Sequence, residues 1–556
     1  MNMMNYIYKI TFLSCLLSFN PIYSLSISAQ KNHKNFFIGL DIANDEFTSQ
    51  RFFGSSAMDS LQLDFVIYHY KPKGTLDEEI EKLNKLENDF NKKNTKIILN
   101  LEVGNWNLDL KSKDGFEYVA QPNGLHVFKF SPKVLSNINK SNGIWGIQYD
   151  EIEHCQINRN LSITIDHRDK ELPGFAETTG MTFKEADNAI YKEAKSLVDT
   201  YKSYGFKYVI GEHVWPVLFN NFARAGITPV YKQMKENWSN VMGACAVGAS
   251  LQYNQELWSC LDFWYYNTYP GHTSQELWAN LLFAYWFGVD KAYIESIASF
   301  SDDGTMNFND NGKTFMRFIN EYVPNHPRSY TFRDYKPEIA IVRFDDTEWG
   351  QGSNCYLYAV LDGQNITYNW TDRLFGAYNL KTSPASEEWL KAWNTITHNE
   401  VDKRSLSWGA SNIYGDRPYK CFAPMNSVAV FDNTVSKKHL DSTKLIFLCG
   451  LFISDSTLND IKSLLQEKNL SVVSSNRFAP KELVDKYSGG TKSFKYGKGH
   501  WIITDDMASK KVKDAVKPFL GNDNEIVLKF KGNKTVSFEI SKDGKSFKQV
   551  KLPVSK

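Results

Sequence analysis

The sequence predicts an α/β protein in which a (β/α)8 barrel is followed by a smaller doubly wound α/β domain and a short C-terminal β segment. From Asn35 onward the chain repeats one pattern: a short apolar run, a polar tip and an amphipathic segment. Such alternation favours parallel strands joined by helices. The 556 residues are also too many for one hydrophobic core, so we expect two or three domains.

The barrel is predicted from eight apolar runs between residues 36 and 297, which match eight βα units. Two of the intervening segments, Leu76–Lys92 and Phe183–Tyr204, are predicted as helices. The predicted strands are Phe36–Ile42, Leu63–Tyr70, Lys96–Val103, Gly143–Asp150, Phe206–Glu212, Val241–Ala249, Leu261–Tyr269 and Asp290–Ile297.

The sixth predicted strand, Val241–Ala249, has a helix as its alternative because it contains Gly243 and Gly248. In that case Leu261–Tyr269 becomes strand six and the count shifts by one. The sequence therefore leaves open whether Glu295 belongs to strand seven or strand eight.

A second domain is predicted after the helix Gly312–Tyr322, where buried-strand patterns resume. Its predicted elements are the strands Glu338–Phe344, Ser427–Phe431, Lys444–Leu448 and Leu470–Ser474 and the helix Leu458–Lys468.

Three further strands are predicted in the tail, at Glu525–Phe530, Thr535–Ile540 and Phe547–Leu552. Asp543-Gly544 between the last two is a strong hairpin signal. The predicted boundaries are a signal peptide at 1–29, the barrel at 30–330, the α/β domain at 331–520 and the C-terminal strands at 521–556.

The N-terminus has the pattern of a signal peptide. Lys9 supplies a positive charge, Ile10–Leu17 forms a short apolar core, and the small residue Ala29 makes cleavage before Gln30 plausible. No later stretch reaches the ~20 apolar residues that a membrane span needs. We therefore expect an exported protein, periplasmic or extracellular, with a lipoprotein anchor at Cys15 as the alternative.

Composition excludes several classes of partner. Lys and Arg total 64 against 63 Asp and Glu, which gives no electrostatic case for nucleic acid or an anionic membrane. Gly-rich phosphate loops, a nucleophile elbow and recognisable metal-ligand spacings are absent from the sequence, so no cofactor and no metal are expected. The 14% aromatic content suits a sugar-binding cleft and a large core equally well.

Acidic residues stand at the ends of several predicted strands, where the βα loops of a barrel gather. Two adjacent acids, Asp150 and Glu151, end an otherwise apolar strand, and Glu102 is predicted on the same side as Asn100. Sequence-distant acids brought to one rim are what glycoside hydrolysis requires. The strand-end acids are Asp41, Asp45, Glu102, Asp150, Glu151, Glu153, Glu212 and Glu295.

Structural roles compete with this interpretation. Glu153 has His154 and Arg159 as possible partners, Glu295 could form a salt bridge to a neighbouring Lys or Arg, and Glu212 could form a structural pair with His213. The predicted substrate-binding residues are the acids Glu102 and Asp41, the sugar platforms Trp106, Trp215, Tyr266 and Tyr269, and the hydroxyl-binding His213; Trp264 is interpreted as a core residue.

Three stretches carry a resemblance to multidomain barrel glycoside hydrolases with a C-terminal glutamine-amidotransferase-like domain, such as the beta-galactosidases with a trimerisation domain. They are Leu281–Ile297, Gly312–Arg328 and the region from Pro337 through Ser475. The Asn-Glu pair of those galactosidases is replaced here by Asp150-Glu151, which is similar to the Asp-Glu pair of hexosaminidases that use the substrate's acetamido group. The resemblance implies an acid role for Glu151.

The second domain is predicted to be non-catalytic. An amidotransferase needs a nucleophilic Cys in a sharp Gly-flanked turn, and Cys449 has no Gly shortly before it. The domain would serve packing, cleft edging or assembly, the last as a homo-oligomer.

Taken together, these patterns predict an exported glycoside hydrolase that takes part in polysaccharide degradation. Its partner would be a glycan substrate, with Glu151 as general acid, Glu295 or Glu212 as nucleophile or base, and Asp150 orienting its neighbour. The alternatives are a non-catalytic glycan-binding protein on the same scaffold and a polysaccharide lyase.

Overall fold

The fold is that of a computed structural model. It describes residues 35–42, 60–70, 74–100, 116–120, 126–157, 175–178, 180–233, 239–263, 272–295, 297–300, 307–345, 355–361, 364–370, 383–397 and 422–553.

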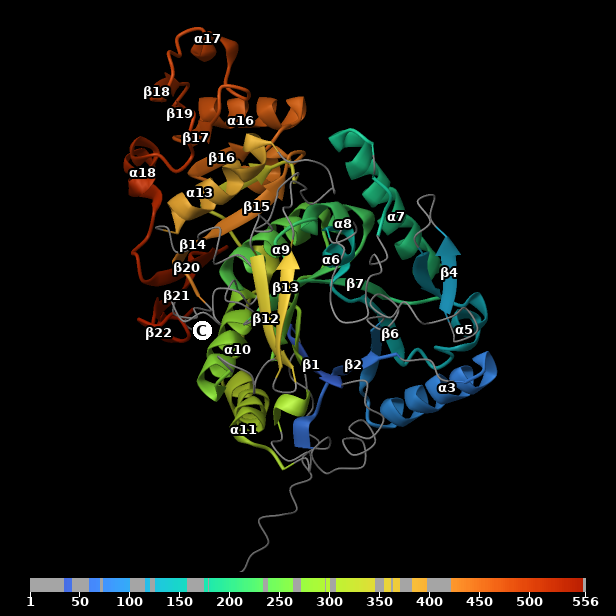
Figure 1. Ribbon diagram of the computed structural model, residues 1–556. Helices are drawn as coiled ribbons and strands as arrows, with labels where there is room; N and C mark the ends of the chain where they lie inside the picture. The colour runs from blue at the N-terminus through green and yellow to red at the C-terminus, as the bar shows by residue number, and fades with distance from the viewer. Residues whose placement is uncertain are drawn as a thin grey trace, which may run out of the picture. The chain divides into compact units, whose positions relative to one another are not determined.

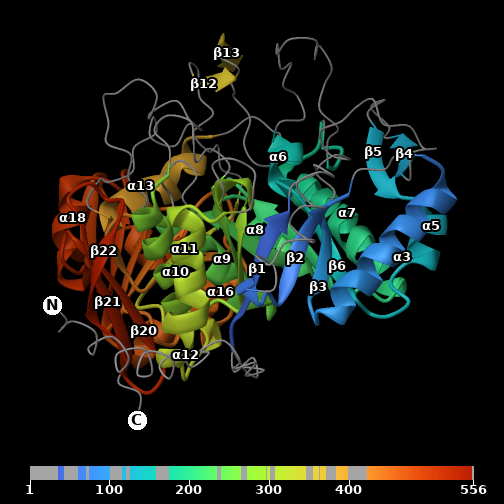
Figure 2. The same ribbon diagram turned by 90° about the horizontal axis from the view of Figure 1, so that it is seen from below.

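Eight parallel strands close into a barrel in the order β1-β10-β9-β8-β7-β6-β3-β2, which confirms the predicted (β/α)8 architecture. β1 and β2 lie side by side in its wall (Figure 2). The strands are β1 (Phe37–Ile42), β2 (Phe65–His69), β3 (Lys96–Asn100), β6 (Ile144–Tyr149), β7 (Tyr208–His213), β8 (Thr228–Gln233), β9 (Trp258–Asp262) and β10 (Lys291–Glu295).

Helices follow the strands, as in Figure 1. Three of them start at the same signal, a Thr-x-x-Glu capping box in which the Thr side chain and the Glu side chain each satisfy a free backbone N–H. These three are α3 (Leu76–Lys92), α7 (Phe183–Ser203) and α10 (Ser274–Phe287). The others of the barrel are α5 (Pro132–Asn137), α6 (Ile152–Ile157), α8 (Phe219–Ala225) and α9 (Ser239–Tyr253), followed by η2 (Ile297–Phe300).

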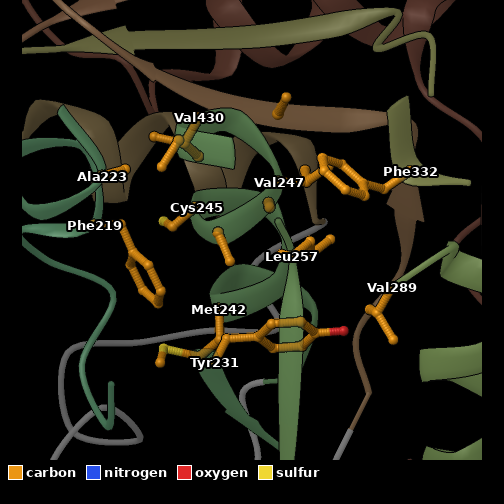
Figure 3. Close-up of a cluster of buried hydrophobic side chains, with 14 of the residues drawn as sticks. Phe219, Ala223, Tyr231, Met242, Cys245, Val247, Leu257, Val289, Phe332 and Val430 are labelled. Carbon is orange, nitrogen blue, oxygen red and sulfur yellow. The ribbon is translucent and has the colours of Figure 1, made fainter. Parts of the chain in front are cut away.

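The predicted sixth strand is wrong, because Val241–Ala249 lies inside helix α9. This helix is apolar on all sides since it packs between barrel strand β8 and strand β15 (Val428–Asp432) of the second domain, as Figure 3 shows for Tyr231 and Val430. A Cβ on Gly248 would stand 1.8 Å from the backbone oxygen of Val430, so the close approach requires glycine.

The true sixth strand, β8, was not predicted because its sequence, TPVYKQ, offers no continuous apolar run. The count of eight is nevertheless right: β9 is strand seven, although it begins earlier than predicted, and Glu295 ends strand eight, β10.

The second domain is a six-stranded sheet in the order β15-β11-β16-β17-β19-β18, in which only the edge strand β18 is antiparallel. Its four predicted strands are present, and β18 and β19 were not predicted. Besides β15, the strands are β11 (Ile339–Arg343), β16 (Leu445–Cys449), β17 (Ser471–Ser474), β18 (Thr491–Tyr496) and β19 (Gly499–Thr504). The helices are η5 (Pro384–Glu387), α13 (Glu388–Ile396), α15 (Lys437–Leu440), α16 (Asp455–Glu467), α17 (Lys481–Val484), α18 (Lys510–Val516) and η6 (Lys517–Phe519).

The three tail strands form a small sheet with β14, in the order β14-β20-β21-β22. Its members are β14 (Met425–Asn426), β20 (Glu525–Phe530), β21 (Lys534–Ile540) and β22 (Phe547–Lys551). Two hairpins, β4 (Phe116–Ala120) with β5 (His126–Phe130) and β12 (Cys355–Leu361) with β13 (Gln364–Trp370), complete the described strands.

The predicted helix Gly312–Tyr322 comprises α11 (Asp310–Arg317) and a π-helical turn, η3 (Phe318–Tyr322), and is followed by α12 (Val323–Asn325) and η4 (Phe332–Asp334). Within the ranges that the structure describes, no helix is both long and apolar enough to cross a membrane.

Candidate active site

A layer of polar side chains closes the C-terminal end of the barrel, above an apolar plug. The plug is made of buried residues such as Ile67, Ile98 and Ile210, which point inward from their strands. Two positions further along each strand, alternation brings the next inward side chain to the rim. The polar layer consists of Asp41, His69, Asn100, Asp150, Glu212, Lys232, Asp262 and Glu295, one from each strand or its immediate end, and all of them are buried.

Lys232 of β8 lies among four carboxylates. Its Nζ is 2.9 Å from Glu295 Oε2, 3.3 Å from Glu151 Oε1, 3.6 Å from Asp262 Oδ2 and 3.7 Å from Glu212 Oε2. Burial acts to lower the pKa of Lys232, but the surrounding carboxylates outweigh it and hold that pKa well above its ordinary value. The lysine is therefore a permanent ammonium in the middle of the acids.

Glu212 is almost completely enclosed, as is Asp262. Gln148 donates to its Oε2 at 3.0 Å and the Tyr293 hydroxyl donates to its Oε1 at 2.9 Å. Burial raises the pKa of Glu212 well above its ordinary value, Lys232 counteracts that shift, and the neighbouring Asp150 adds to it. Glu212 thus has a firm position but little access to a substrate.

A hydrogen-bonded chain links the first half of the barrel rim. His69 Nε2 lies 2.7 Å from Asp41 Oδ2, and Asn100 Nδ2 lies 3.4 Å from the same His69 nitrogen. Asn100 also donates to Asp150 Oδ2 at 3.3 Å. Asp150, the neighbour of Glu151, is held between this chain and Glu212.

Glu151 sits directly after strand β6 with a backbone φ of 46°, in the left-handed region that costs a non-glycine residue energy. Such strain is typical of positions whose side-chain direction matters. Its side chain is 15% exposed, whereas that of Glu295 is 9% exposed and those of Glu212 and Asp262 are 1% exposed. Glu151 and Glu295 are thus the two most exposed of the four acids around Lys232.

Glu212, Cys260 and Glu295 have donor atoms within 4.8 Å of one another, close enough to surround a cation. The Lys232 ammonium already contacts Glu212 and Glu295 and provides the positive charge there. Burial and the neighbouring acids raise the pKa of the Cys260 thiol well above its ordinary value, so the thiolate that a metal prefers is disfavoured.

His213 lies on the opposite side of strand β7 from Glu212, away from the polar layer. It is fully buried, its ring stacks on Phe219 at 3.8 Å between centroids, and burial lowers its pKa to about 3. The imidazole is therefore neutral at physiological pH, and it lies buried between Phe219 and Glu153, whose Oε2 is 3.5 Å from its Nδ1. Trp215 is buried as well, in the main hydrophobic core.

The segment 214–218, which follows β7, is held by two carboxylates from different parts of the chain. Glu153 of α6 accepts hydrogen bonds from the backbone N–H groups of Val214 at 2.6 Å and Trp215 at 2.7 Å. Asp345, just beyond β11 of the second domain, accepts one from the N–H of Leu218. Glu153 is thus a structural anchor, and the predicted partner Arg159 and the side chain of His154 lie outside the described residues.

The structure brings together the predicted residues Asp41, Asp150, Glu151, Glu212 and Glu295. Five other predicted site residues, Asp45, Glu102, Trp106, Tyr266 and Tyr269, and the predicted core residue Trp264 lie outside the described residues.

Sequence reasoning missed Lys232, Asp262, His69, Gln148 and Tyr293. Asp262 could have been found by the argument that identified Asn100, because it is also a polar residue within an apolar strand.

No family model and no curated protein matches the chain. Similar solved structures include an exo-beta-1,4-mannosidase from Opitutaceae bacterium strain TAV5 (10% identity, 87% of this chain and 94% of that one, TM-score 0.47). They also include a catalytic mutant of a GH42 beta-galactosidase from G. stearothermophilus (10% identity, 91% and 92%, TM-score 0.49). A third is the GH42 exo-carrageenase from Bacteroides ovatus (10% identity, 91% and 73%, TM-score 0.37). None of these descriptions mentions an amidotransferase domain, so that part of the resemblance stays a prediction.

Proposed function

We propose that this protein is an exported glycoside hydrolase that cleaves a glycosidic bond with Glu151 and Glu295. The observation that carries the proposal is their arrangement: they are the two most exposed of the four acids around Lys232, they stand at the ends of different barrel strands, and both contact the Lys232 ammonium. Paired carboxylates facing one substrate site are the requirement of this chemistry.

The spacing of this pair favours a retaining mechanism. Glu151 lies 3.3 Å and Glu295 2.9 Å from one nitrogen, so their nearest oxygens are closer together than the ~6.5 Å at which inverting pairs begin. A water molecule would not fit between the second acid and the sugar at that distance. Glu212 forms a second close pair with Glu295, but its burial favours a supporting role.

In the proposed mechanism, protonated Glu151 donates its proton to the glycosidic oxygen as that bond breaks, and the ionised Glu295 carboxylate attacks the anomeric carbon. This forms a glycosyl ester on Glu295 and releases the leaving alcohol. Glu151, now ionised, takes a proton from water, which attacks the same carbon and frees Glu295. Asp150 orients Glu151 through the backbone, and the two donors on Glu212 fix the floor of the site.

The test is a reducing-sugar screen of the wild type over a panel of neutral, amino and acidic glycans, repeated with Glu151→Gln and Glu295→Gln. We expect each variant to lose about 100-fold or more in kcat, since general acid–base steps contribute ~10²–10⁴-fold. Glu321→Gln, an exposed acid on η3, serves as the matched control and should keep wild-type activity. Wild-type cleavage with both site variants fully active would show that the pair is assigned wrongly.

The product of the first turnover decides the stereochemistry. Proton NMR of the fresh product should show the anomer of the substrate, and the opposite anomer would contradict the retaining mechanism. A protein that binds glycans but cleaves none would be a binding protein instead. An unsaturated product from an acidic glycan would identify a lyase.

Export remains part of the proposal and rests on the N-terminal pattern alone. Mass spectrometry of the mature protein should find an N-terminus at Gln30, and a lipid-modified Cys15 would identify an anchored form instead.

A further inference from the structure

Lys232 faces acids from four separate elements. Glu212 comes from β7, Asp262 from β9, Glu295 from β10 and Glu151 from the segment after β6. The other titratable groups near it are the Cys260 thiol and the Tyr293 hydroxyl. Four carboxylates lie within 3.7 Å of this buried nitrogen, although one carboxylate is enough to neutralise the charge of a lysine.

Physical chemistry explains why a lysine stands here. Carboxylates crowded in a buried layer repel one another and would each bind a proton, which would leave neither a nucleophile nor a defined acid. One ammonium at the centre offsets that repulsion most strongly for the nearest partner, which is Glu295 at 2.9 Å. Its contact with Glu151 also fixes the distance between the two reacting groups.

We propose that Lys232 is a positioning residue that keeps Glu295 ionised and holds it at a fixed separation from Glu151. The proposal rests on the function proposed above and adds a determinant of its pH dependence. Within the part of the chain that the structure describes, the ion pairs of Lys232 are all with carboxylates, and as an ammonium it has no lone pair with which to attack a carbonyl carbon.

The decisive variant is Lys232→Met, which keeps the length of the side chain and removes the charge. Without the ammonium each neighbouring carboxyl gives up its proton less readily, so both limbs of the pH–rate profile should move to higher pH. We expect kcat to fall by about 100-fold or more, with KM changed far less. Lys232→Arg should restore the position of the pH profile, although the larger guanidinium recovers only part of the rate.

Lys291→Met is the matched control. Lys291 is an equally buried lysine of the same barrel, and it forms an ion pair with Glu256. It is the first residue of β10 and therefore lies at the opposite end of the barrel from the polar layer. Its loss should lower stability without moving the pH profile. If the pH–rate profile of Lys232→Met has the same shape and position as that of the wild type and differs only in height, the proposal is overturned.

A second readout does not require activity. Because the pKa of Lys232 is raised, the lysine stays charged at every pH below that value. In the wild type its contribution to the free energy of unfolding is therefore the same at about pH 5 and at about pH 8. Lys232→Met leaves buried carboxylates unpaired, and its loss in melting temperature should grow from about pH 5 to about pH 8. An equal loss at both pH values would refute the charge-pairing role, whether or not the wild type cleaves glycans.

Borohydride trapping tests the opposite chemistry. Wild-type protein treated with glycolaldehyde and borohydride should show no adduct on Lys232 by peptide mass spectrometry. A specific adduct there would mean that the lysine is a neutral nucleophile that forms Schiff bases, and would overturn the proposal.

Discussion

Glu212 shows how a buried acid in this site makes stability depend on pH. Burial raises its pKa above the ordinary 4.5, and a carboxyl with a raised pKa in the folded state binds protons that the unfolded chain has released. The stability linked to Glu212 is therefore fully present below about pH 4.5 and is lost as the pH rises through the raised value. Lys232 and Asp150 both act on the pKa of Glu212, so the pH at which this stability is lost depends on the cluster as well as on Glu212 itself.

We expect Glu212→Gln to flatten this dependence, because the amide has no proton to lose. Urea unfolding at about pH 5 and about pH 7.5 should show a smaller difference in unfolding free energy for the variant than for the wild type. Glu321→Gln, which is exposed, should retain the wild-type difference. The same slope in all three proteins would mean that other groups set the pH dependence.

The sequence predicted the acids of the site better than their partners. Asp150, Glu151, Glu212 and Glu295 could be found because each ends an apolar strand. Lys232 could not, since β8 reads as a polar segment and only the closed barrel shows that its lysine points toward acids from neighbouring strands.

At the scale of elements, the segment 214–218 is defined by the groups that satisfy its backbone. Glu153 accepts hydrogen bonds from two backbone N–H groups of this segment. A buried N–H left without an acceptor costs about 1–3 kcal/mol. We expect Glu153→Ala to lower the unfolding free energy by about 2–5 kcal/mol. The amide protons of Val214 and Trp215 should exchange with solvent faster.

Glu153→Gln is the matched variant, because its amide oxygen can still accept both hydrogen bonds. It should recover most of the stability and the slow exchange. If the alanine and glutamine variants are equally destabilised, the charge of Glu153 rather than its acceptor geometry holds the segment.

Helix α9 illustrates what local patterns cannot reveal about an element. A buried strand and a helix buried on all sides are both continuous apolar runs, and the central part of α9, Val241–Ala249, is apolar around the whole circumference. What decides its conformation is the second domain, since β15 covers the face that would otherwise meet water. Capped amphipathic helices such as α3 carried their own signal and were predicted with the correct bounds.

At the scale of the whole molecule, the second sheet contacts the barrel near the proposed site. Arg343 of β11 donates to the backbone oxygen of Pro216 at 2.6 Å and packs 4.1 Å over the ring of Trp389, while Asp345 accepts from Leu218. Leu218 has a φ of 61°, a conformation that a leucine keeps only when its surroundings enforce it. These contacts join the second sheet to the segment that follows β7, and the non-catalytic role of this domain stays a prediction.

Variants of Asp345 and Asp432 can distinguish whether the second domain sets the geometry of the proposed site or only stabilises the barrel. Both stand at the ends of neighbouring strands of the second sheet and bind the barrel, but Asp432 accepts from Gln252 and Tyr253 at the end of α9 instead of the segment 214–218. Each change to Ala should lower the melting temperature. Only Asp345→Ala should also lower kcat/KM, by about 10-fold, because it releases the segment 214–218, which follows Glu212. That segment is also held by Glu153, which lies two residues after Glu151, so its release should disturb both acids. Equal activity losses in the two variants would show that the domain only stabilises the barrel, whereas a loss confined to Asp345→Ala would mean that the second sheet helps to set the geometry of the acids.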